Sequence, residues 1–498
     1  MMKILSAAQI KELDAYTIQY EPVPSIDLME RACQAFITWF VERYDAIHRV
    51  GIVCGTGNNG GDGLGIARML HEWNYPVKVW IVRGGVKETS DFQTNLQRLD
   101  PKIQVVEITS EVKAELFDDR TMLIDAIFGS GLSRPVEGIY EQFIDCLNSS
   151  KAIKIAVDIP SGMFADKHSE EEIFRAHHTV SFQLPKLAFM MPENNCYTGE
   201  WHLVDIGLSK KGLHEIQSSF YLTTLKAIKK IWKPRNKFDH KGKFGHALLI
   251  AGSKGKMGAC ILSAKAALRA GVGLLTVHVP QSGHPIVQAA APEAMALIDS
   301  SDDHFSEQKL VDHFTAIGIG PGLGQHADTK NALAQLFTKF SKPMVIDADA
   351  LNLLSAHPEL QALIPAGSIL TPHPKEFERL VGGWSDDFER LVKLQQFSKK
   401  INGVVVLKGA YTTIACPSGD VYFNPTGNPG MATGGSGDVL TGILTGLLAQ
   451  GYSTEETALM GTYLHGLAGD LSAREMGMTS LIAGDLIDFL PMAFKKLS

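Results

Sequence analysis

The stretch NPTGNPGMATGGSGDVLTGILTGLLAQG, residues 424 to 451, joins a glycine-rich turn to one carboxylate at the start of an amphipathic helix. Apolar residues on a single helical face predict a helix that begins near Gly437 and Asp438. Its first N–H groups are free to bind an anion, and the glycines let a phosphate come close. A carboxylate beside a phosphate suits the removal of a proton from a hydroxyl that is about to be phosphorylated. Asp438 is therefore the first candidate base, and the alternative is that it only caps the helix.

Length and composition restrict the class of protein. A chain of 498 residues predicts two to four domains, and 45% hydrophobic with 20% charged residues is typical of a soluble globular protein. The net charge of −7 argues against nucleic acid or an anionic membrane as the main partner. The six cysteines lack metal-binding spacing, which predicts reduced and mostly buried thiols. Because we find neither a signal-peptide pattern nor an apolar run of membrane length, we expect a cytoplasmic protein.

Two series of strand-like and helix-like segments organise the chain. VGIVCG, VKVWIV, TMLIDAIFG and IKIAVDIPSG read as buried strands of a parallel sheet, with a helix near Leu64 to Trp73. From about 209 to 239 the chain becomes helical and basic, and strand-like patterns stop. A second series runs from GHALLIAGS through GVVVLKGAYTTIAC, and Ser453 with Glu456 has the spacing of a capping box. The sequence predicts two α/β domains, each with ligand sites at the carboxyl ends of its strands.

Five strand ends of the second series carry polar or glycine-rich loops. These loops are GSKGKMGA, GPGLG, DADALN, TPHPKEFERL and KGAYT. A generic turn explains any one of them, but five together with GGSGD predict a site. No GxxxxGK[ST] motif is present, so a P-loop does not hold a nucleotide here.

Residues 238 to 491 resemble the ADP/ATP-dependent NAD(P)H-hydrate dehydratases of the ribokinase-like superfamily. The resemblance is carried by GPGLG, DADALN, TPHPKEF, KG followed by Thr412, and NPTGNPGMATGGSGDVLTG, whereas Met257 stands where relatives often have an aromatic residue. It implies a nucleotide site made of Lys408, Gly409, Ala410, Tyr411, Thr412 and Gly437. It also implies contact with the hydrated dinucleotide by Ala259, Gly322, His373 and Asp438. For His373, the alternative is an imidazole that only makes local hydrogen bonds.

The implied reaction is chemically reasonable. Hydration of a dihydronicotinamide ring leaves a hydroxyl on the carbon beside the ring nitrogen, and hydroxide is a poor leaving group. ADP or ATP, with magnesium, would phosphorylate this hydroxyl while Asp438 accepts its proton. The ring nitrogen can then expel phosphate and restore the conjugated ring.

The first series opens with GTGNNGGDGLG, residues 55 to 65, between a strand and a helix. It contains GxGxxG, so a nicotinamide-dependent dehydrogenase is an alternative. In such enzymes an acid ends the next strand, but here Arg83, Gly84 and Gly85 follow VKVWIV. The amide and carboxylate oxygens of Asn58, Asn59 and Asp62 suit contacts with an ion, a ribose or a phosphate.

Two further strands of this half end in acids, Asp125 and Asp158. Either acid alone could simply bond to loop amides. Because the loops NNGGDG, DAIFGSGLSRPVEG and VDIPSG converge on one edge of a sheet, together they predict a pocket.

Residues 6 to 208 are similar to the NAD(P)H-hydrate epimerases through these three loops, although Thr56, Met163 and Phe164 depart from the usual pattern. The resemblance implies that Asp158 is the acid/base group. It implies a potassium ion, an oxygen-seeking cation, held by Asn59, Asp125 and Ser161. It also implies a hydrate site composed of Asn58, Asn59, Gly60, Gly61, Asp62, Gly129, Ser130, Gly131, Leu132, Ser133, Arg134, Pro135 and Asp158.

The leading hypothesis is therefore a bifunctional enzyme that repairs nicotinamide nucleotides. Its fold would be α/β, with two three-layer α/β/α domains: a Rossmann-like epimerase at 1–215 and a ribokinase-like dehydratase at 225–498. Its partners would be small molecules, namely hydrated NADH or NADPH and ADP or ATP, and we expect a homo-oligomer. One alternative makes the second half a kinase for a vitamin precursor or a sugar. Another makes the first half a binding module without catalysis.

Overall fold

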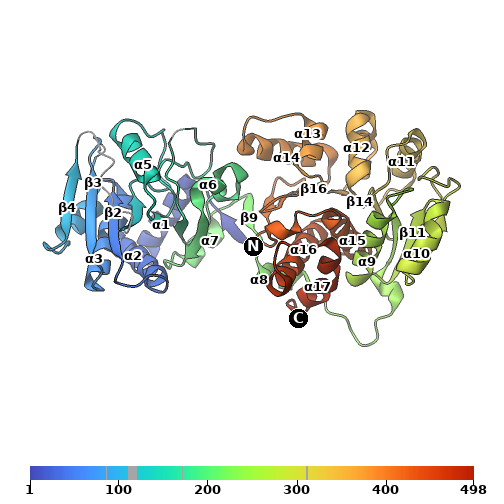
Figure 1. Cartoon of the computed structure of the whole chain (residues 1–498), viewed down its shortest axis with the longest axis horizontal. Helices are drawn as coiled ribbons and strands as arrows, with labels where there is room; N and C mark the ends of the chain where they lie inside the picture. The colour runs from blue at the N-terminus through green and yellow to red at the C-terminus, as the bar shows by residue number, and fades with distance from the viewer. Residues whose placement is uncertain (86, 110–120, 171, 310–311) are drawn as a thin grey trace. The chain divides into compact units, whose positions relative to one another are not determined.

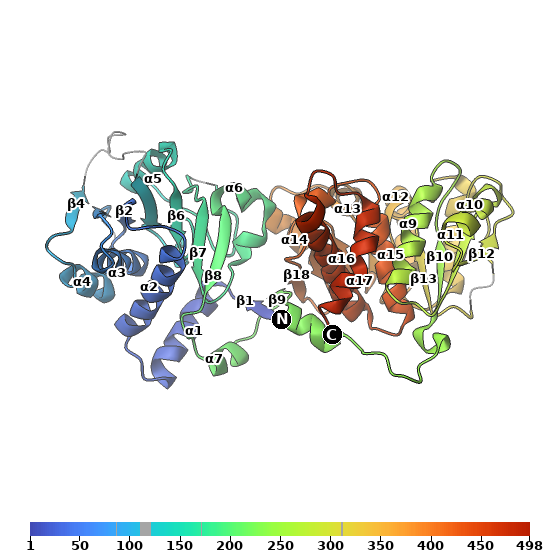
Figure 2. The ribbon, with the colours of Figure 1, turned by 60° about the horizontal axis from the view of Figure 1, so that its bottom comes forward.

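The computed structural model describes residues 1–85, 87–109, 121–170, 172–309 and 312–498. The chain forms two compact units, coloured blue to green and green to red in Figures 1 and 2. The N-terminal unit comprises Lys3–Ser218 together with Asp386–Phe388. The C-terminal unit comprises Met1–Met2, Ser219–Ser385 and Glu389–Ser498.

A seven-stranded parallel sheet forms the centre of the N-terminal unit, in the order β4-β3-β2-β5-β6-β7-β8. The strand order reverses between β2 and β5, and loops at such a point leave a crevice at the carboxyl ends of the strands. The strands are β2 (Arg49–Cys54), β3 (Val77–Val82), β4 (Gln104–Ile108), β5 (Thr121–Ala126), β6 (Lys154–Val157), β7 (His178–Phe182) and β8 (Glu200–Val204).

Helices cover both faces of this sheet. One core lies between the sheet and helices α2 and α3, and a second lies between the sheet and α5. The unit therefore has three layers. Its helices are α1 (Ala7–Tyr20), α2 (Ser25–Val41), α3 (Asn58–Glu72), α4 (Ser90–Gln97), α5 (Ile139–Ser149), α6 (Asn195–Thr198) and α7 (Lys210–Glu215).

Helix α3 begins at Asn58, earlier than the predicted start near Leu64. The glycines that read as a loop lie inside the helix because it packs directly against the strands. A Cβ at Gly60 would lie 1.8 Å from the carbonyl oxygen of Gly55, and one at Gly63 would lie 2.7 Å from the sulfur of Cys54. Glycine is required here by the close approach of backbone to backbone.

The C-terminal unit contains an eleven-stranded sheet, in the order β1-β9-β18-β17-β16-β15-β14-β13-β10-β11-β12. It is parallel from β12 to β16 and antiparallel at β16-β17-β18. Its strands are β1 (Met2–Ile4), β9 (Phe220–Leu222), β10 (His246–Ile250), β11 (Leu274–Val279), β12 (Met295–Ile298), β13 (Ala316–Ile319), β14 (Met344–Ile346), β15 (Ile369–Leu370), β16 (Val404–Leu407), β17 (Thr413–Ala415) and β18 (Val421–Phe423).

The largest core of this unit lies between the sheet and four helices, α9, α15, α16 and α17, which lie side by side in Figure 2. Helix α15 packs against β10, β13 and β14, so its first turn lies at the carboxyl ends of these strands. The helices are α8 (Leu225–Ile231), α9 (Met257–Arg269), α10 (His284–Ala290), α11 (Ala327–Lys339), α12 (Ala348–Ala356), α13 (Pro374–Val381), α14 (Asp387–Ile401), α15 (Ser436–Ala449), α16 (Thr454–Met476) and α17 (Ala483–Lys495).

Several short strands were not expected. Strand β9 lies in the segment where strand-like patterns were predicted to stop, and GVVVLKGAYTTIAC forms two antiparallel strands, β16 and β17. A strand of three residues has too little alternation to be recognised from sequence. The capping box of Ser453 and Glu456 is confirmed at the start of α16, and all six cysteines are free, four of them buried. Among the described residues, no helix is long and apolar enough to cross a membrane.

One glycine controls how the ends of β13 and β14 meet. Gly320 has φ +129°, and a Cβ there would lie 1.8 Å from the carbonyl oxygen of Asp347. We expect Gly320→Ala to lower the free energy of unfolding by about 3 kcal/mol, through backbone strain and overpacking. Urea unfolding followed by circular dichroism measures this.

The control variant is Gly258→Ala. Gly258 is exposed on α9, and a Cβ there meets no other atom within 4 Å. Alanine should leave stability unchanged or raise it by up to about 1 kcal/mol. Equal effects of the two substitutions would contradict the steric argument.

Candidate active sites

A cavity of about 890 Å³ opens in the C-terminal unit beside the ends of β14 and β16 and the first turn of α15. Most of the residues predicted for the second site line this cavity. They are His373, Lys408, Gly409, Ala410, Tyr411, Thr412, Gly437 and Asp438. The structure therefore gathers residues that are far apart in the sequence into one concave site.

The start of α15 is shaped to receive an anion. Its N-cap is Gly435, at φ +91°, and no side chain caps the helix. A Cβ at this position would lie 2.5 Å from Leu262 and 3.0 Å from Ala483, so glycine is required for steric as well as conformational reasons. Asp438 lies within the first turn rather than at the cap, so the capping alternative is wrong. The first N–H groups of the helix are left to face the cavity.

Asp438 is a half-buried carboxylate with a raised pKa. Burial is the main cause, the negative charge of Asp347 adds to it, and Lys408 acts in the opposite direction, giving a pKa of about 6. A group with this pKa is mostly ionised at neutral pH and is still a better base than an ordinary aspartate. Asp438 thus has the electrostatic properties of a general base.

Lys408 is held beside the cavity by two acids that sequence reasoning did not select. Its Nζ lies 2.9 Å from Oδ1 of Asp347 and 4.0 Å from Oε2 of Glu376, while Thr441 donates to the other oxygen of Asp347 at 2.6 Å. Burial would lower the pKa of Lys408, but the two carboxylates raise it above its usual value. Lys408 therefore stays a cation. The motifs DADALN and TPHPKEF contain these acids and were predicted to form the site, but the sequence did not show which of their residues line the cavity.

His373 makes the local hydrogen bond of the alternative interpretation, and its contact with the dinucleotide stays a prediction. Its Nδ1 accepts a hydrogen bond from the amide of Glu376 at 3.2 Å, and Glu376 accepts one from the amide of His373 at 2.8 Å. The residue thus caps α13 through a local hydrogen bond. Its side chain is also 45% exposed and lines the cavity, so the ring has a second edge available to a ligand.

His465 is another residue that sequence reasoning missed. Its Nε2 lies 3.0 Å from the carbonyl oxygen of Ser436, the first residue of α15, and burial lowers its pKa to about 4. The imidazole is therefore neutral, and its Nε2–H donates to that carbonyl. His465 fixes the turn that presents the helix amides to the cavity.

Ala259 and Gly322 lie close to each other but outside the lining of this cavity. A Cβ at Gly322, which has φ +59°, would lie 3.1 Å from the Cβ of Ala259. The hydroxyl of Ser253 donates to the carbonyl oxygen of Gly322 at 2.8 Å. The loops after β10 and β13 are thus joined, which leaves the role of Ala259 and Gly322 in binding a prediction.

In the N-terminal unit, Asp125 and Ser161 meet at the ends of neighbouring strands. Asp125 is fully buried and accepts from the hydroxyl of Ser161 at 2.6 Å, from its amide at 2.8 Å and from the amide of Ile127 at 3.1 Å. Burial nevertheless raises the pKa of Asp125 to about 6. These described partners are all neutral, so the carboxylate is buried without a positive charge to offset its desolvation.

Asp158 ends the next strand in a strained conformation. Its φ is +64°, and the amide of Ile159 donates to the carbonyl of Val157 at 2.8 Å, which is a γ-turn centred on the aspartate. Strained backbone of this kind is concentrated at functional sites. The turn directs the side chain toward Ser130 in the loop after β5, which forms a hydrogen bond with it.

Lys186, also missed in the sequence, pairs with Asp158. Its Nζ lies 2.7 Å from Oδ1 of Asp158 and 3.0 Å from the hydroxyl of Ser181, and the lysine side chain is 1% exposed. Burial alone would raise the pKa of Asp158, but Lys186 and the amide of Phe182 hold it below its usual value. Asp158 is therefore ionised near neutral pH.

The remaining residues predicted for the hydrate site lie on α3 and in the loop after β5. Asn59 is buried in the first turn of α3 against Gly129, and its Nδ2 has no hydrogen-bond partner among the described residues. Asp62, in the next turn of α3, has a pKa well above its usual value because of burial and the charge of Asp158. The other residues of these segments are Asn58, Gly60 and Gly61 on α3, and Gly131, Leu132, Ser133, Arg134 and Pro135 after β5.

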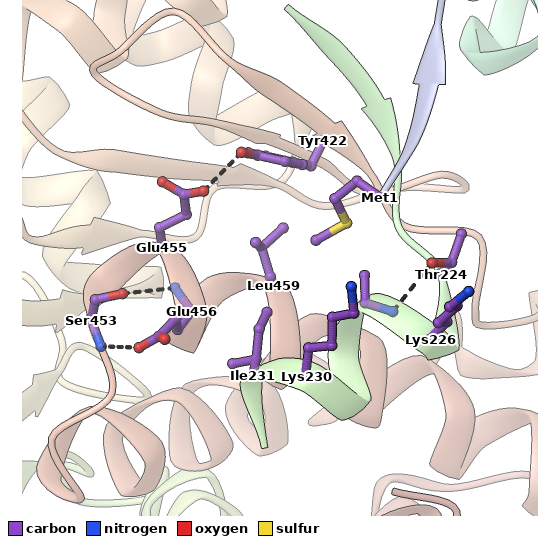
Figure 3. A pocket seen from close by; sticks show the side chains of 11 residues that line it. Met1, Thr224, Lys226, Lys230, Ile231, Tyr422, Ser453, Glu455, Glu456 and Leu459 are labelled. Carbon is purple, nitrogen blue, oxygen red and sulfur yellow. Dashed lines mark hydrogen bonds between the residues drawn. The ribbon is translucent and has the colours of Figure 1, made fainter. Parts of the chain in front are cut away.

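A second cavity of about 660 Å³ in the C-terminal unit lies between α8, β18 and the start of α16 (Figure 3). Several of its polar groups bond to one another. Ser453 and Glu456 form the capping box of α16, and Tyr422 donates to Glu455 at 2.8 Å. The side chains of Lys226 and Lys230 also line this cavity.

Comparison with known proteins identifies relatives of both units. The family model for NAD(P)H-hydrate dehydratase matches residues 247–492, and the model for the YjeF-related protein N-terminus matches residues 25–188. The bifunctional NAD(P)H-hydrate repair enzyme of Moorella thermoacetica is 36% identical, with 100% of this chain and 97% of the relative covered. The enzyme of the same name from Escherichia coli is 33% identical, with 93% and 88% covered. A ribokinase-like superfamily protein from Enterococcus faecalis is 30% identical, with 57% of this chain and 98% of that chain covered, at a TM-score of 0.51.

Removing the positive charge of Lys186 should strongly destabilise the N-terminal unit. Lys186→Met leaves Asp158 buried and unpaired, which should lower the free energy of unfolding at pH 7 by about 3 kcal/mol. Because pairing depresses the pKa of Asp158, its contribution is present above pH ~3.9 and disappears as the pH falls through the lower, folded-state pKa. The deficit measured by urea unfolding should therefore shrink at pH 3.5.

The matched control combines Lys186→Met with Asp158→Asn, which removes both charges. This double variant should be more stable than Lys186→Met alone at pH 7. A deficit that is the same at both pH values, or is not relieved in the double variant, would contradict the ion pair as its source.

Proposed function

Because the chain belongs to the bifunctional NAD(P)H-hydrate repair enzymes, we propose that it epimerises hydrated NADH and NADPH and dehydrates one epimer back to the reduced cofactor at the expense of ADP or ATP. The N-terminal unit is the epimerase and the C-terminal unit the dehydratase. The observation that carries the proposal is Asp438, a carboxylate with a raised pKa in the first turn of an uncapped helix that opens onto a cavity. The expected cytoplasmic location and homo-oligomeric state stay predictions.

In the dehydratase, Asp438 accepts the proton of the hydrate's hydroxyl while the hydroxyl oxygen attacks the terminal phosphorus of the nucleotide. The bond from phosphorus to the bridging oxygen breaks, and a phosphate ester forms on the ring carbon. The lone pair of the ring nitrogen then expels inorganic phosphate, which leaves an iminium ion, and loss of a proton from the neighbouring ring carbon restores the dihydronicotinamide. Asp438 supplies the base, and the amides of α15 with Lys408 stabilise charge on the transferred group.

Nucleotide binding is assigned to the segment from Lys408 to Thr412 together with Gly437. Magnesium fits this site because Asp347 and Glu376 place carboxylates on the cavity lining, and magnesium in such sites is bound by one or two carboxylates plus substrate phosphates. Its charge would neutralise the phosphates as the phosphoryl group transfers. His373, Ala259 and Gly322 are assigned to the hydrated dinucleotide.

In the epimerase, Asp158 exchanges a proton with the hydroxyl of the hydrate while the carbon that carries this hydroxyl passes through a planar or ring-opened intermediate, from which either configuration can re-form. Lys186 keeps it ionised, and Asp62, whose pKa is raised, is suited to donate a hydrogen bond to the same substrate. The segment from Asn58 to Asp62 and the loop 129–135 are assigned to hydrate binding. Opposite pKa shifts at neighbouring groups are what an acid/base pair requires.

Potassium fits beside Asp125. Asn59, Asp125 and Ser161 supply only oxygen ligands, and Asp125 is a buried carboxylate whose pKa is raised for want of a positive partner. A monovalent cation would offset this desolvation and attract the oxygens of the hydrate. These three residues are the proposed ligands.

Two units are needed because hydration produces both configurations at the new carbon atom. A phosphoryl-transfer site that fixes the hydroxyl in line with phosphorus accepts one configuration. The epimerase converts the other, so all the damaged cofactor reaches the dehydratase.

The two activities should separate by single substitutions. Asp438→Asn should lower kcat for dehydration by about 1000-fold or more by removing the base, and leave epimerisation unchanged. Asp158→Asn should abolish epimerisation and leave dehydration of the accepted epimer intact. The assay follows the recovery of dihydronicotinamide absorbance and the exchange of the two epimers on chromatography.

Free phosphate distinguishes a dehydratase from a kinase. The dehydratase should release one phosphate for each reduced cofactor recovered, whereas a kinase for a vitamin precursor or a sugar accumulates a stable phosphoester. Loss of both activities from either substitution would show that the sites are not separate. Binding of the hydrate by the N-terminal unit without exchange of epimers would favour the binding-module alternative.

Dehydration should depend on pH through Asp438. The base must be ionised, so kcat/KM should fall about tenfold per pH unit below the pKa of about 6 and level off above it. Because Lys408 lowers the pKa of Asp438, Lys408→Met should move this limb to higher pH in addition to weakening nucleotide binding. An unchanged limb in Lys408→Met would contradict the assignment of the limb to Asp438.

A further inference from the structure

Two histidines and a glutamate meet on the edge of the N-terminal sheet. His178 begins β7, Glu200 begins β8, and the strands pair in parallel with His178 opposite Glu200 and Val180 opposite His202. Residues two apart on a strand share a face, so His178, Glu200 and His202 lie on one face of the sheet. Nδ1 of His178 lies 3.3 Å from Nε2 of His202, and Oε2 of Glu200 lies 3.8 and 4.0 Å from these two nitrogens.

This geometry matches a metal site. Two imidazole nitrogens bound to tetrahedral zinc at about 2.0–2.1 Å lie about 3.3–3.4 Å from each other. Trp39 packs against both rings, with centroid distances of 5.6 Å to His178 and 5.0 Å to His202, and so holds them in place. The Glu200 side chain is 71% exposed, so it can rotate to bring its carboxylate into bonding distance of an ion held by the two ring nitrogens.

We propose that His178, Glu200 and His202 bind one zinc ion. A ligand set of two histidines and one carboxylate leaves a coordination position open to water. His178 and Glu200 lie at the amino ends of their strands, whereas Asp158 follows the carboxyl end of β6, so the ion serves no step of epimerisation. Its effect is to tie the edge strand β8 to β7 and protect that edge against opening.

The test is metal binding by the full chain after treatment with a chelator. Titration with ZnCl₂ followed by calorimetry should show one tight site, and CoCl₂ should give the visible absorption bands of a tetrahedral cobalt complex. His178→Gln and His202→Gln should each weaken zinc binding ~100-fold, and Glu200→Gln about tenfold. Zinc should also raise the melting temperature of the wild-type chain and not that of His202→Gln.

A second cluster provides the matched control. His304, His326 and Asp328 also gather, but His326 already accepts a hydrogen bond from the amide of Asp328 through Nδ1, and both side chains are more than half exposed. His326→Gln should leave the tight site unchanged. Because Glu200 is exposed, Glu200→Gln keeps the test valid if a histidine variant fails to fold.

Two results would overturn the proposal. Equal zinc affinity of the wild type, His202→Gln and Glu200→Gln would show that the two imidazoles only share a hydrogen bond. Loss of the tight site in His326→Gln would place the metal at the cluster of His304, His326 and Asp328, which is one of two further groups of possible ligands among the described residues. Epimerase activity, measured in each folded variant, should stay at the wild-type level with and without zinc.

Discussion

The cost of burying a carboxylate at the carboxyl end of a parallel strand determines the chemistry of both units. Asp125 and Asp158 lie at such strand ends, and Asp438 lies nearby in the first turn of α15. The surroundings of these three aspartates offset the cost of burial in different ways. Asp158 is paired with a buried lysine and stays ionised, Asp125 receives only neutral donors, and Asp438 is half-buried with a second acid nearby. A buried charge without a partner changes its pKa or attracts a cation. The same penalty thus yields an ionised carboxylate at Asp158, the proposed potassium ligand Asp125, and at Asp438 a carboxylate whose pKa of about 6 suits the proposed base.

Close approach of backbone is the second constraint, and it explains where glycine is required. In the N-terminal unit, the glycines of α3 let the helix touch the strands β2 and β5. In the C-terminal unit, Gly435 starts α15 in a left-handed conformation where any side chain would strike Leu262. Both helices begin without a side-chain cap, so their first amides remain for a ligand. Both units therefore place a helix amino terminus with free amides at the switch point of a parallel sheet, a position suited to binding an anionic ligand.

The sequence predicted which loops meet, because loops that follow buried parallel strands share an edge of the sheet. It did not predict Lys186, Asp347 or His465, since each completes its site through a partner distant in sequence, and no local pattern distinguishes it from other polar residues. The predicted start of α3 was also wrong, because the glycines before Leu64 are typical of a loop. They lie in a helix because it packs closely against β2. Short strands such as β9 were not predicted for a different reason, namely that three residues carry no periodicity. The loops that form each site could thus be predicted from the sequence, whereas the residues that pair with the site's charged groups could be identified only from the tertiary structure.

The different pKa shifts of the two candidate catalytic aspartates fit the different demands of their reactions. Phosphoryl transfer needs a base that takes a proton as the hydroxyl oxygen attacks, and a pKa of about 6 gives Asp438 greater basicity while it remains mostly ionised at neutral pH. Epimerisation returns the proton it removes, so Asp158 must act in both directions with no net change in charge. A strong base would hold the proton, whereas Lys186 lowers the basicity of Asp158, so this carboxylate releases the proton readily. In the proposed reaction, the lone pair of the ring nitrogen also weakens the bond from the ring carbon to the hydroxyl. In the proposed mechanism, Lys186 thus serves proton transfer as well as the stability of the buried aspartate.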